Sequence, residues 1–268
     1  MTDTLAALQY YGGKSARNPL GRWIASHLPR TNLYCEPFAG MLGILLARPP
    51  SSTEIINDLD ERVSNWWTIV RDRNAELTDR LRLTPYDENA YNRIQQTDWT
   101  TKDELWRAWA FTIVCDQSFG GKNAGTFRRP YYDRPTSDPY PDYLAAKVLR
   151  LRDRLANVKI FNQPAAKFLT RLANEPEAVI YCDPPYYTAR DDYKERGYNV
   201  DELTEALLAQ TGKVLISGYP GEWEHLNWQH LDHHRITTTA RDRQVPRTER
   251  IWANYPLTAT QPLWTDLT

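Results

Sequence analysis

The sequence predicts an α/β fold built on a mostly parallel sheet, because short apolar runs of strand length alternate with helical patterns along most of its 268 residues. Strands that alternate with helices in this way pair in parallel, and helices then cover both faces of the sheet. Turn residues separate the runs. The strand candidates are residues 32–36, 54–57, 158–161, 178–182 and 213–217.

The composition is that of a globular protein, with 41% hydrophobic and 25% charged residues. The net charge of −1 gives no overall support to nucleic-acid binding, so any basic surface must be local. Cys35, Cys115 and Cys182 show no C-x-x-C spacing, which argues against a zinc cluster or a disulfide framework and fits a reducing cytoplasm. No secretory pattern begins the chain, and no apolar run approaches the ~18 residues that span a bilayer. We therefore expect a cytoplasmic protein without a metal and outside the membrane.

The first strand candidate leads into a turn of small residues at 37–43 and then into an apolar helix start at 44–47. Gly40 and Gly43 let the backbone approach a ligand closely. The turn matches neither G-x-G-x-x-G nor a P-loop, so we expect a ligand without phosphate that offers amino, carboxyl and ribose groups. A tight strand-to-helix crossover is the alternative.

Asp58 stands where the second strand candidate ends. An acidic side chain at this position can accept hydrogen bonds from ribose hydroxyls. Alternatively, Asp58 or Asp60 could cap the helix that the pattern predicts from about residue 61.

Asp183, Pro184, Pro185 and Tyr186 directly follow the apolar run at 178–182. Open α/β sheets bind ligands at the carboxyl ends of their strands. The prolines stiffen the turn, so the Asp183 carboxylate and the Pro184 carbonyl become two fixed acceptors beside an aromatic ring.

Two acceptors beside a ring suit an exocyclic amino group on a flat base. The lone pair of such an amino group is delocalised into the ring, so methylation requires activation, alignment and stabilisation of the developing positive charge. Tyr186 would stack on the base. The alternative is a rigid turn with no chemical role.

Residues 76–157 break the alternation with two or three helical patterns, including 104–114, followed by an irregular segment at 117–143. Basic and aromatic side chains interleave there, which suits phosphate contact and base stacking, although a solvated loop is the alternative. The candidate DNA-binding residues are Lys122, Arg128, Arg129 and Arg134.

Five segments, in their order along the chain, resemble the Dam-like D12 class of N6-adenine-specific DNA methyltransferases. They are YYGGKSARNPLGRWI, EPFAGMLGILLARPP, EIINDLDERVSNWW, VIYCDPPYY and KVLISGYP. The resemblance implies a Rossmann-like methyltransferase domain (1–75 and 158–268) with an inserted, mainly helical target-recognition domain (76–157). It also implies S-adenosyl-L-methionine as cofactor and double-stranded DNA as partner. The adenine must then be flipped out of the duplex, and binding should weaken steeply with salt.

The resemblance assigns roles residue by residue. The catalytic residues are Asp183, Pro184 and Tyr186. The cofactor-binding residues are Tyr10, Gly12, Gly13, Lys14, Glu36, Pro37, Phe38, Ala39, Gly40, Gly43, Asp58 and Asp183. One departure is Gln163, where many members have an Asp that contacts the cofactor's adenine. Gln163 or a backbone group would substitute.

Several alternatives stay open. The same acceptors suit the N4 amino group of cytosine or adenine in RNA, and a catalytically silent DNA-binding regulator could keep the fold. The intact turn at 183–186 and Lys14 argue against the silent regulator. Arg247 could touch DNA, but we expect it to pair with Glu249. GATC is a family-level expectation for the target sequence. The sequence does not distinguish a methyltransferase that accompanies a restriction enzyme from a solitary or phage-borne one. We expect a monomer or weak dimer.

Overall fold

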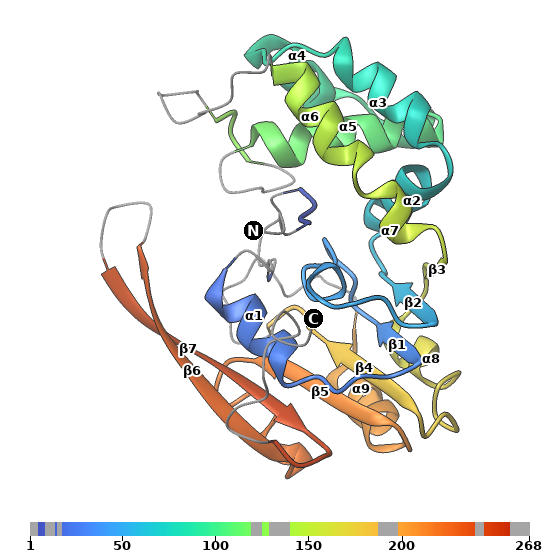
Figure 1. The fold of residues 1–268 in the computed structure, drawn as a ribbon. Helices are drawn as coiled ribbons and strands as arrows, with labels where there is room; N and C mark the ends of the chain where they lie inside the picture. Colours follow the sequence, from blue (N-terminus) through green and yellow to red (C-terminus); the bar gives the residue numbers. More distant parts are fainter. Residues whose placement is uncertain are drawn as a thin grey trace.

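A seven-stranded sheet in the order β3-β2-β1-β4-β5-β7-β6 organises the molecule (Figure 1). The computed structural model describes residues 5–8, 14, 18–118, 125–128, 140–186, 198–238 and 244–257. Strands β1 to β5 pair with one another in parallel, whereas β7 runs antiparallel to both β5 and β6. The strands are β1 Leu33–Glu36, β2 Thr53–Asn57, β3 Val158–Phe161, β4 Ala178–Cys182, β5 Lys213–Gly218, β6 Gln229–Thr238 and β7 Gln244–Ala253.

The strand order reverses between β1 and β4. From β1 the chain moves outward to β2 and β3, and it then returns to β4 on the other side of β1. Ligands of open α/β sheets bind at such a reversal, outside the carboxyl ends of the strands. All five strands predicted from the sequence are confirmed, and their parallel pairing brings their carboxyl ends to one edge.

Helices cover both faces of the sheet, as the alternating pattern predicts. On one face, α8 (Ala165–Leu169) and α9 (Val200–Leu208) pack on apolar side chains of β4 and β5. On the other face, α1 (Pro19–Ser26) and α2 (Glu61–Asp72) share a core with the alternate side chains of the strands. Asp60 caps α2 by accepting the Arg62 N–H. No helix among the described residues is long and apolar enough to cross a membrane.

Helices also fill the part of the chain between β2 and β3, and they form the upper layer of the molecule in Figure 1. Contacts between α2 and α5 join this layer to the sheet, and the apolar core is continuous across the junction. The α5 helix is buried along most of its length, which explains its nearly unbroken apolar sequence. The helices are α3 Asn74–Arg82, α4 Glu88–Gln96, α5 Glu104–Gln117, α6 Tyr140–Leu149 and α7 Arg152–Leu155.

The helix start expected at residues 44–47 is wrong. This segment forms one 3-10 turn, η1 (Leu45–Ala47), and the chain becomes extended at Arg48. Pro49 and Pro50 explain the early end, because a residue before proline avoids the helical region and proline has no N–H to continue the helix. The connection from β1 to β2 is therefore a compact loop.

Candidate functional site

The residues that the sequence singles out lie at the carboxyl ends of the parallel strands. Glu36 ends β1, Asp58 follows β2, Asp183 follows β4, and Ser217 lies near the end of β5. Segments far apart in the sequence therefore meet at one edge of the sheet, which is the ligand-binding edge of this architecture.

The Asp183 carboxylate is held by two partners. Its Oδ1 accepts hydrogen bonds from Lys14 Nζ at 2.6 Å and from Ser217 Oγ at 2.9 Å. The Lys14 side chain is only 6% exposed, so this bond joins two charged groups in a partly dry setting and is of the stronger kind. Over the described residues, no group donates to Oδ2 of Asp183 or to the Pro184 carbonyl.

Four contacts surround the turn that contains Tyr186. The Tyr186 hydroxyl donates to Glu249 Oε2 at 2.8 Å, and the ring packs edge-on against Tyr219 with centroids 4.5 Å apart. Lys14 Nζ lies 4.6 Å from the ring centroid. Tyr198 donates its hydroxyl to the Pro185 carbonyl at 2.7 Å. Burial, together with the nearby Asp183 and Glu249 carboxylates, raises the pKa of Tyr186 well above its usual value, so the ring stays a neutral phenol.

The loop after β1 is fastened to the end of β2. Asp58 Oδ2 accepts the Gly40 N–H at 2.9 Å, and Trp67 donates its indole N–H to the Gly40 carbonyl at 2.8 Å. Gly40 has φ +43°, and a Cβ there would have no atom within 4 Å. Open space therefore borders the backbone at Gly40, which is what a close-lying ligand requires.

Asp58 supports this loop, and the cap of α2 is Asp60 instead. The second Asp58 oxygen, Oδ1, accepts the Asp60 N–H at 2.9 Å. Burial raises the pKa of Asp58 to about 6, although the N–H groups of Gly40 and Asp60 oppose this shift. Each oxygen of a carboxylate can accept a further bond, so a ribose hydroxyl can still bind here.

Gln163 lies at the adjoining end of β3. Its backbone N–H donates to Asn57 Oδ1 at 3.1 Å, and its carbonyl accepts from Asn57 Nδ2 at 2.9 Å. These bonds orient the residue, while its side-chain Nε2 is buried and has no hydrogen-bond partner among the described residues. A buried, unpaired donor at the ligand edge fits an acceptor on a bound molecule.

Glu36 is almost fully buried and accepts the Tyr34 hydroxyl at 2.8 Å. Burial raises the pKa of Glu36 to about 8. Phe38, in the loop that follows, packs edge-on against Tyr198 with centroids 5.8 Å apart. The β1 loop therefore contacts the side chain that anchors the 183–186 turn.

Sequence reasoning missed Ser217, Tyr219 and the role of Glu249. Ser217 and Tyr219 could have been found, because they end the strand next to the 183–186 turn. No local signal marks Glu249. The expected pairing of Arg247 with Glu249 is wrong, because Glu249 Oε1 accepts Arg235 Nη2 at 3.0 Å and Arg247 lies over the Tyr219 ring at 5.9 Å. Strand register decides this pairing, and β6 supplies the arginine.

Several predicted residues lie outside the described part of the chain. Of the basic candidates, Arg128 is described, and its guanidinium donates to the Asp116 carbonyl at 3.0 Å. Phe127 packs against Tyr86 and Tyr91. This part of the segment is therefore attached to the helical layer, and contact between Arg128 and DNA stays a prediction. The residues outside the description are Tyr10, Gly12, Gly13, Lys122, Arg129 and Arg134.

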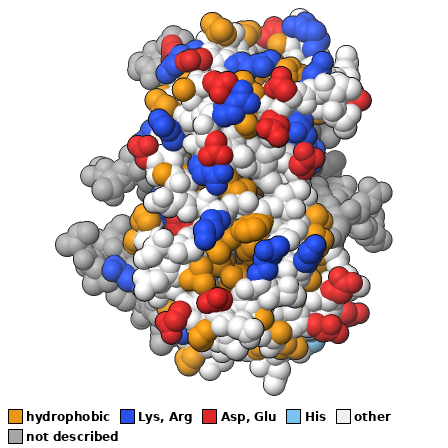
Figure 2. Space-filling model, turned by 90° about the vertical axis from the view of Figure 1, so that its right-hand side faces the viewer, with side chains coloured by type: hydrophobic (Ala, Val, Ile, Leu, Met, Phe, Trp, Pro, Cys, Tyr) orange, Lys and Arg blue, Asp and Glu red, His pale blue; other side chains and the backbone are white. Residues whose placement is uncertain are grey.

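One further feature lies away from this edge. An open groove near the start of β1 and β2 is lined by Leu33, Ile55, Phe161 and Phe168, with Arg171 beside them. Figure 2 shows the side of the molecule on which β3 and α8 lie, with apolar side chains gathered in its lower half near Lys and Arg side chains. Over the described ranges, no group of three or more His, Cys, Asp or Glu side chains is arranged to hold a metal ion.

Comparison with known proteins agrees with this geometry. The family model described as D12 class N6 adenine-specific DNA methyltransferase matches residues 10–213. The DNA adenine methylase of Salmonella typhi is 26% identical over 230 residues, which cover 81% of this chain and 78% of that relative. The DNA adenine methylase of Escherichia coli strain K12 is 24% identical over 240 residues, which cover 82% of each chain. With the site at the expected sheet edge and the family match spanning most of the sequence, this chain belongs to the D12 class of N6 adenine-specific DNA methyltransferases.

Proposed function

We propose that Asp183, Pro184 and Tyr186 carry out the N6 methylation of an adenine that has been rotated out of a DNA duplex. The observation that carries this proposal is the fixed Asp183 carboxylate, which Lys14 and Ser217 hold through Oδ1. Its Oδ2 and the Pro184 carbonyl then form a pair of acceptors for the two N–H bonds of one amino group.

The two acceptors both orient and activate the amino nitrogen. Hydrogen bonds from both N–H groups favour a more tetrahedral nitrogen with its lone pair exposed, and the carboxylate stabilises the positive charge that develops there. Tyr186 stacks on the flipped base, which offsets part of the cost of about a few kcal/mol for unstacking and unpairing it. S-adenosyl-L-methionine supplies the electrophilic methyl group when it is bound.

The chain offers a suitable set of groups for this cofactor. Open space beside Gly40 admits a ligand close to the backbone, and Asp58 can accept from ribose hydroxyls. Gln163 Nε2 is a buried donor that has no partner in the described part of the chain. Many family members place an Asp at this point, which accepts from the cofactor, whereas Gln163 Nε2 would donate to an acceptor atom of the cofactor. The loop that contains Gly40 follows Glu36 and also contains Pro37, Phe38 and Ala39.

We further propose that residues 76–157 act as the target-recognition domain, with residues 1–75 and 158–268 as the catalytic domain. The support is the position of α3 to α6 between β2 and β3, together with the basic residues of the 117–143 segment. The formal net charge of −1 means that DNA must be attracted by a local patch. A cytoplasmic location and a monomeric or weakly dimeric state complete the proposal.

A product analysis tests the reaction. Purified protein is incubated with labelled S-adenosyl-L-methionine and unmethylated plasmid DNA, and the DNA is digested to nucleosides. The expected product is N6-methyldeoxyadenosine. Modified cytidine, or no labelled nucleoside, would contradict the proposal.

The role of Asp183 is tested with the same assay. Asp183→Ala should abolish transfer while leaving the circular dichroism spectrum unchanged, whereas Asp79→Ala, an exposed carboxylate on α3, should transfer at the normal rate. Turnover retained by Asp183→Ala would remove this residue from its proposed role.

A further inference from the structure

We propose that Glu249, on β7, is a positioning residue for methyl transfer, because it fixes the orientation of the Tyr186 ring. Glu249 is only 3% exposed, and each of its carboxylate oxygens has a partner. Oε2 accepts the Tyr186 hydroxyl at 2.8 Å, and Oε1 accepts Arg235 Nη2 at 3.0 Å. The inference rests on the proposed role of Tyr186 in stacking on the base.

Strand register explains why Glu249 reaches the site. The pairing between β5 and β7 ends with Gly218 opposite Arg250, so Glu249 lies one residue beyond the last pair, where the β5 chain leaves the sheet toward Tyr219. Glu249 and Ile251 are two residues apart on the strand and share one face of the sheet. Ile251 belongs to the core on that face.

A buried carboxylate at this position carries a cost unless it is paired. Arg235 from the neighbouring strand supplies the charge partner, and the Tyr186 hydroxyl supplies a second donor. Apolar neighbours such as Ile251 show that this strand face can be filled by hydrocarbon. A hydrocarbon could bind neither Arg235 nor the Tyr186 hydroxyl, and of these two bonds the one to Tyr186 reaches the proposed site.

The Tyr186 ring is held from three sides in the described structure. Tyr219 packs against it at 4.5 Å with the ring planes inclined at 65°, Lys14 Nζ lies 4.6 Å from its centroid, and Glu249 anchors its hydroxyl. A ring held at its hydroxyl end keeps its orientation before the base arrives. The ring then loses no conformational freedom when the base stacks on it, and the amino group of the base meets Asp183 at the correct angle.

A double-mutant cycle tests this inference on single-turnover and steady-state methylation of unmethylated plasmid DNA. The variants are Glu249→Ala, Tyr186→Phe and the double variant. We expect each single change to lower kcat by about 10- to 100-fold, because small misplacements of reacting groups cost up to roughly that much, with KM for S-adenosyl-L-methionine unchanged. The double variant should be no slower than the slower single variant, because both changes remove the same hydrogen bond.

Two further variants separate positioning from stability. Glu249→Gln keeps an oxygen acceptor for the Tyr186 hydroxyl and should recover most of the lost rate. Asp232→Ala removes an ion pair with Arg250 at 2.6 Å on the same two strands, and it should leave kcat unchanged because Asp232 has no contact with Tyr186. Melting temperatures of all variants are measured alongside.

Distinct results overturn the inference and the proposed function. If wild-type protein methylates no adenine, the proposed function fails. If wild-type protein is active but Glu249→Ala matches Asp232→Ala in kcat, or if the two single losses multiply in the double variant, the positioning role is wrong. Should Glu249→Ala fail to fold, Tyr186→Phe decides: normal kcat overturns the inference, and lowered kcat with normal KM supports it.

Discussion

At the scale of single residues, the carboxyl groups of the site differ from those on the protein surface because they are buried at strand ends. Glu36 is the extreme case, with a pKa raised to about 8 by burial. Near neutral pH it is therefore mostly a neutral acid beside the Tyr34 hydroxyl. Asp58, which has a pKa of about 6 and two backbone N–H partners, is ionised more easily.

The Glu36 shift predicts a particular dependence of stability on pH. The folded pKa of about 8 lies above the ordinary value of 4.5, so the folded state binds this proton more tightly than the unfolded state. The free energy of unfolding should therefore fall as pH rises between these two values. Glu36→Gln removes this contribution, so wild type should lose stability relative to the variant as pH rises. Urea unfolding at several pH values measures the difference.

A matched variant is Glu61→Gln, whose side chain at the start of α2 is 63% exposed. Its stability should follow that of wild type closely over the same pH range. Parallel pH profiles for wild type and Glu36→Gln would show that the Glu36 carboxyl titrates normally in the folded protein.

At the scale of elements, two glycines illustrate different constraints. Gly212 lies between α9 and β5, and a Cβ there would come within 2.7 Å of the Ala178 carbonyl and 2.8 Å of the Glu175 carbonyl. Both obstacles are backbone atoms, so they cannot rotate away. Gly40 instead borders open space but has a positive φ, which strains any other residue.

Gly212→Ala should destabilise the protein by about 1–3 kcal/mol, as overpacking against a rigid backbone usually does. Once folded, the variant should bind S-adenosyl-L-methionine with normal affinity, because Gly212 lies at the amino end of β5, opposite the ligand edge. Thermal and urea unfolding measure the loss of stability. An unchanged midpoint would show that the backbone at this junction adjusts freely.

Gly40→Ala makes the complementary prediction. Its methyl group would enter the open space that we propose for the cofactor, so affinity for S-adenosyl-L-methionine should fall at least several-fold. The positive φ should also cost about 1–2 kcal/mol of stability. Isothermal titration calorimetry compares this variant with Gly212→Ala. Normal affinity in Gly40→Ala would place the cofactor elsewhere.

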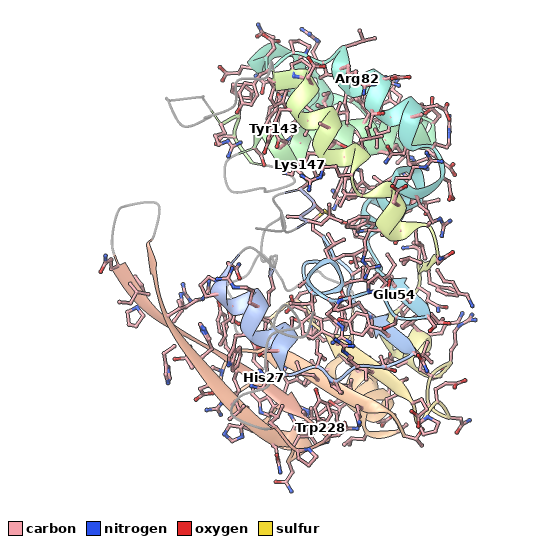
Figure 3. The ribbon with its side chains drawn as sticks, viewed as in Figure 1. His27, Glu54, Arg82, Tyr143, Lys147 and Trp228 are labelled. Carbon is pink, nitrogen blue, oxygen red and sulfur yellow. The ribbon has the colours of Figure 1, made fainter. Side chains whose placement is uncertain are left out.

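At the scale of the whole molecule, a buried ion pair joins the end of the helical layer to the sheet. Arg154 of α7 binds Glu54 of β2 through its two terminal nitrogens, Nη1 and Nη2, and Nη2 also donates to the Leu45 carbonyl at 2.9 Å. The two side chains are 12% and 5% exposed. Figure 3 shows Glu54 on the sheet, far from Arg82 in the helical layer.

Arg154→Ala should cost about 3–5 kcal/mol, because it leaves a buried carboxylate without its partner. Arg82→Ala breaks the exposed pair with Asp79 and should cost at most about 1 kcal/mol. Equilibrium unfolding of both variants under one set of conditions provides the comparison. Equal losses would mean that Glu54 finds another partner or reaches water.

Much of the fold was predictable because its signals are local. Five apolar runs matched five strands, Asp60 capped the helix after β2, and the turn at 183–186 followed a strand as expected. The failure at residues 44–47 also has a local cause, since two prolines end the helical pattern after one turn. The prediction of a helix start at 44–47 relied on the apolar residues and gave too little weight to the two prolines that follow them.

The sequence by itself determined the five parallel strands in their order along the chain and the family to which the chain belongs. It also predicts Asp183 and Pro184 as the acceptor pair. Only the tertiary structure decided which side chains meet. Lys14 binds Asp183 although the two lie far apart in the sequence, and Glu249 binds Tyr186 and Arg235 rather than Arg247. The physical reason is that strand order and register bring distant segments together, and neither is encoded in the residues next to any one of these side chains.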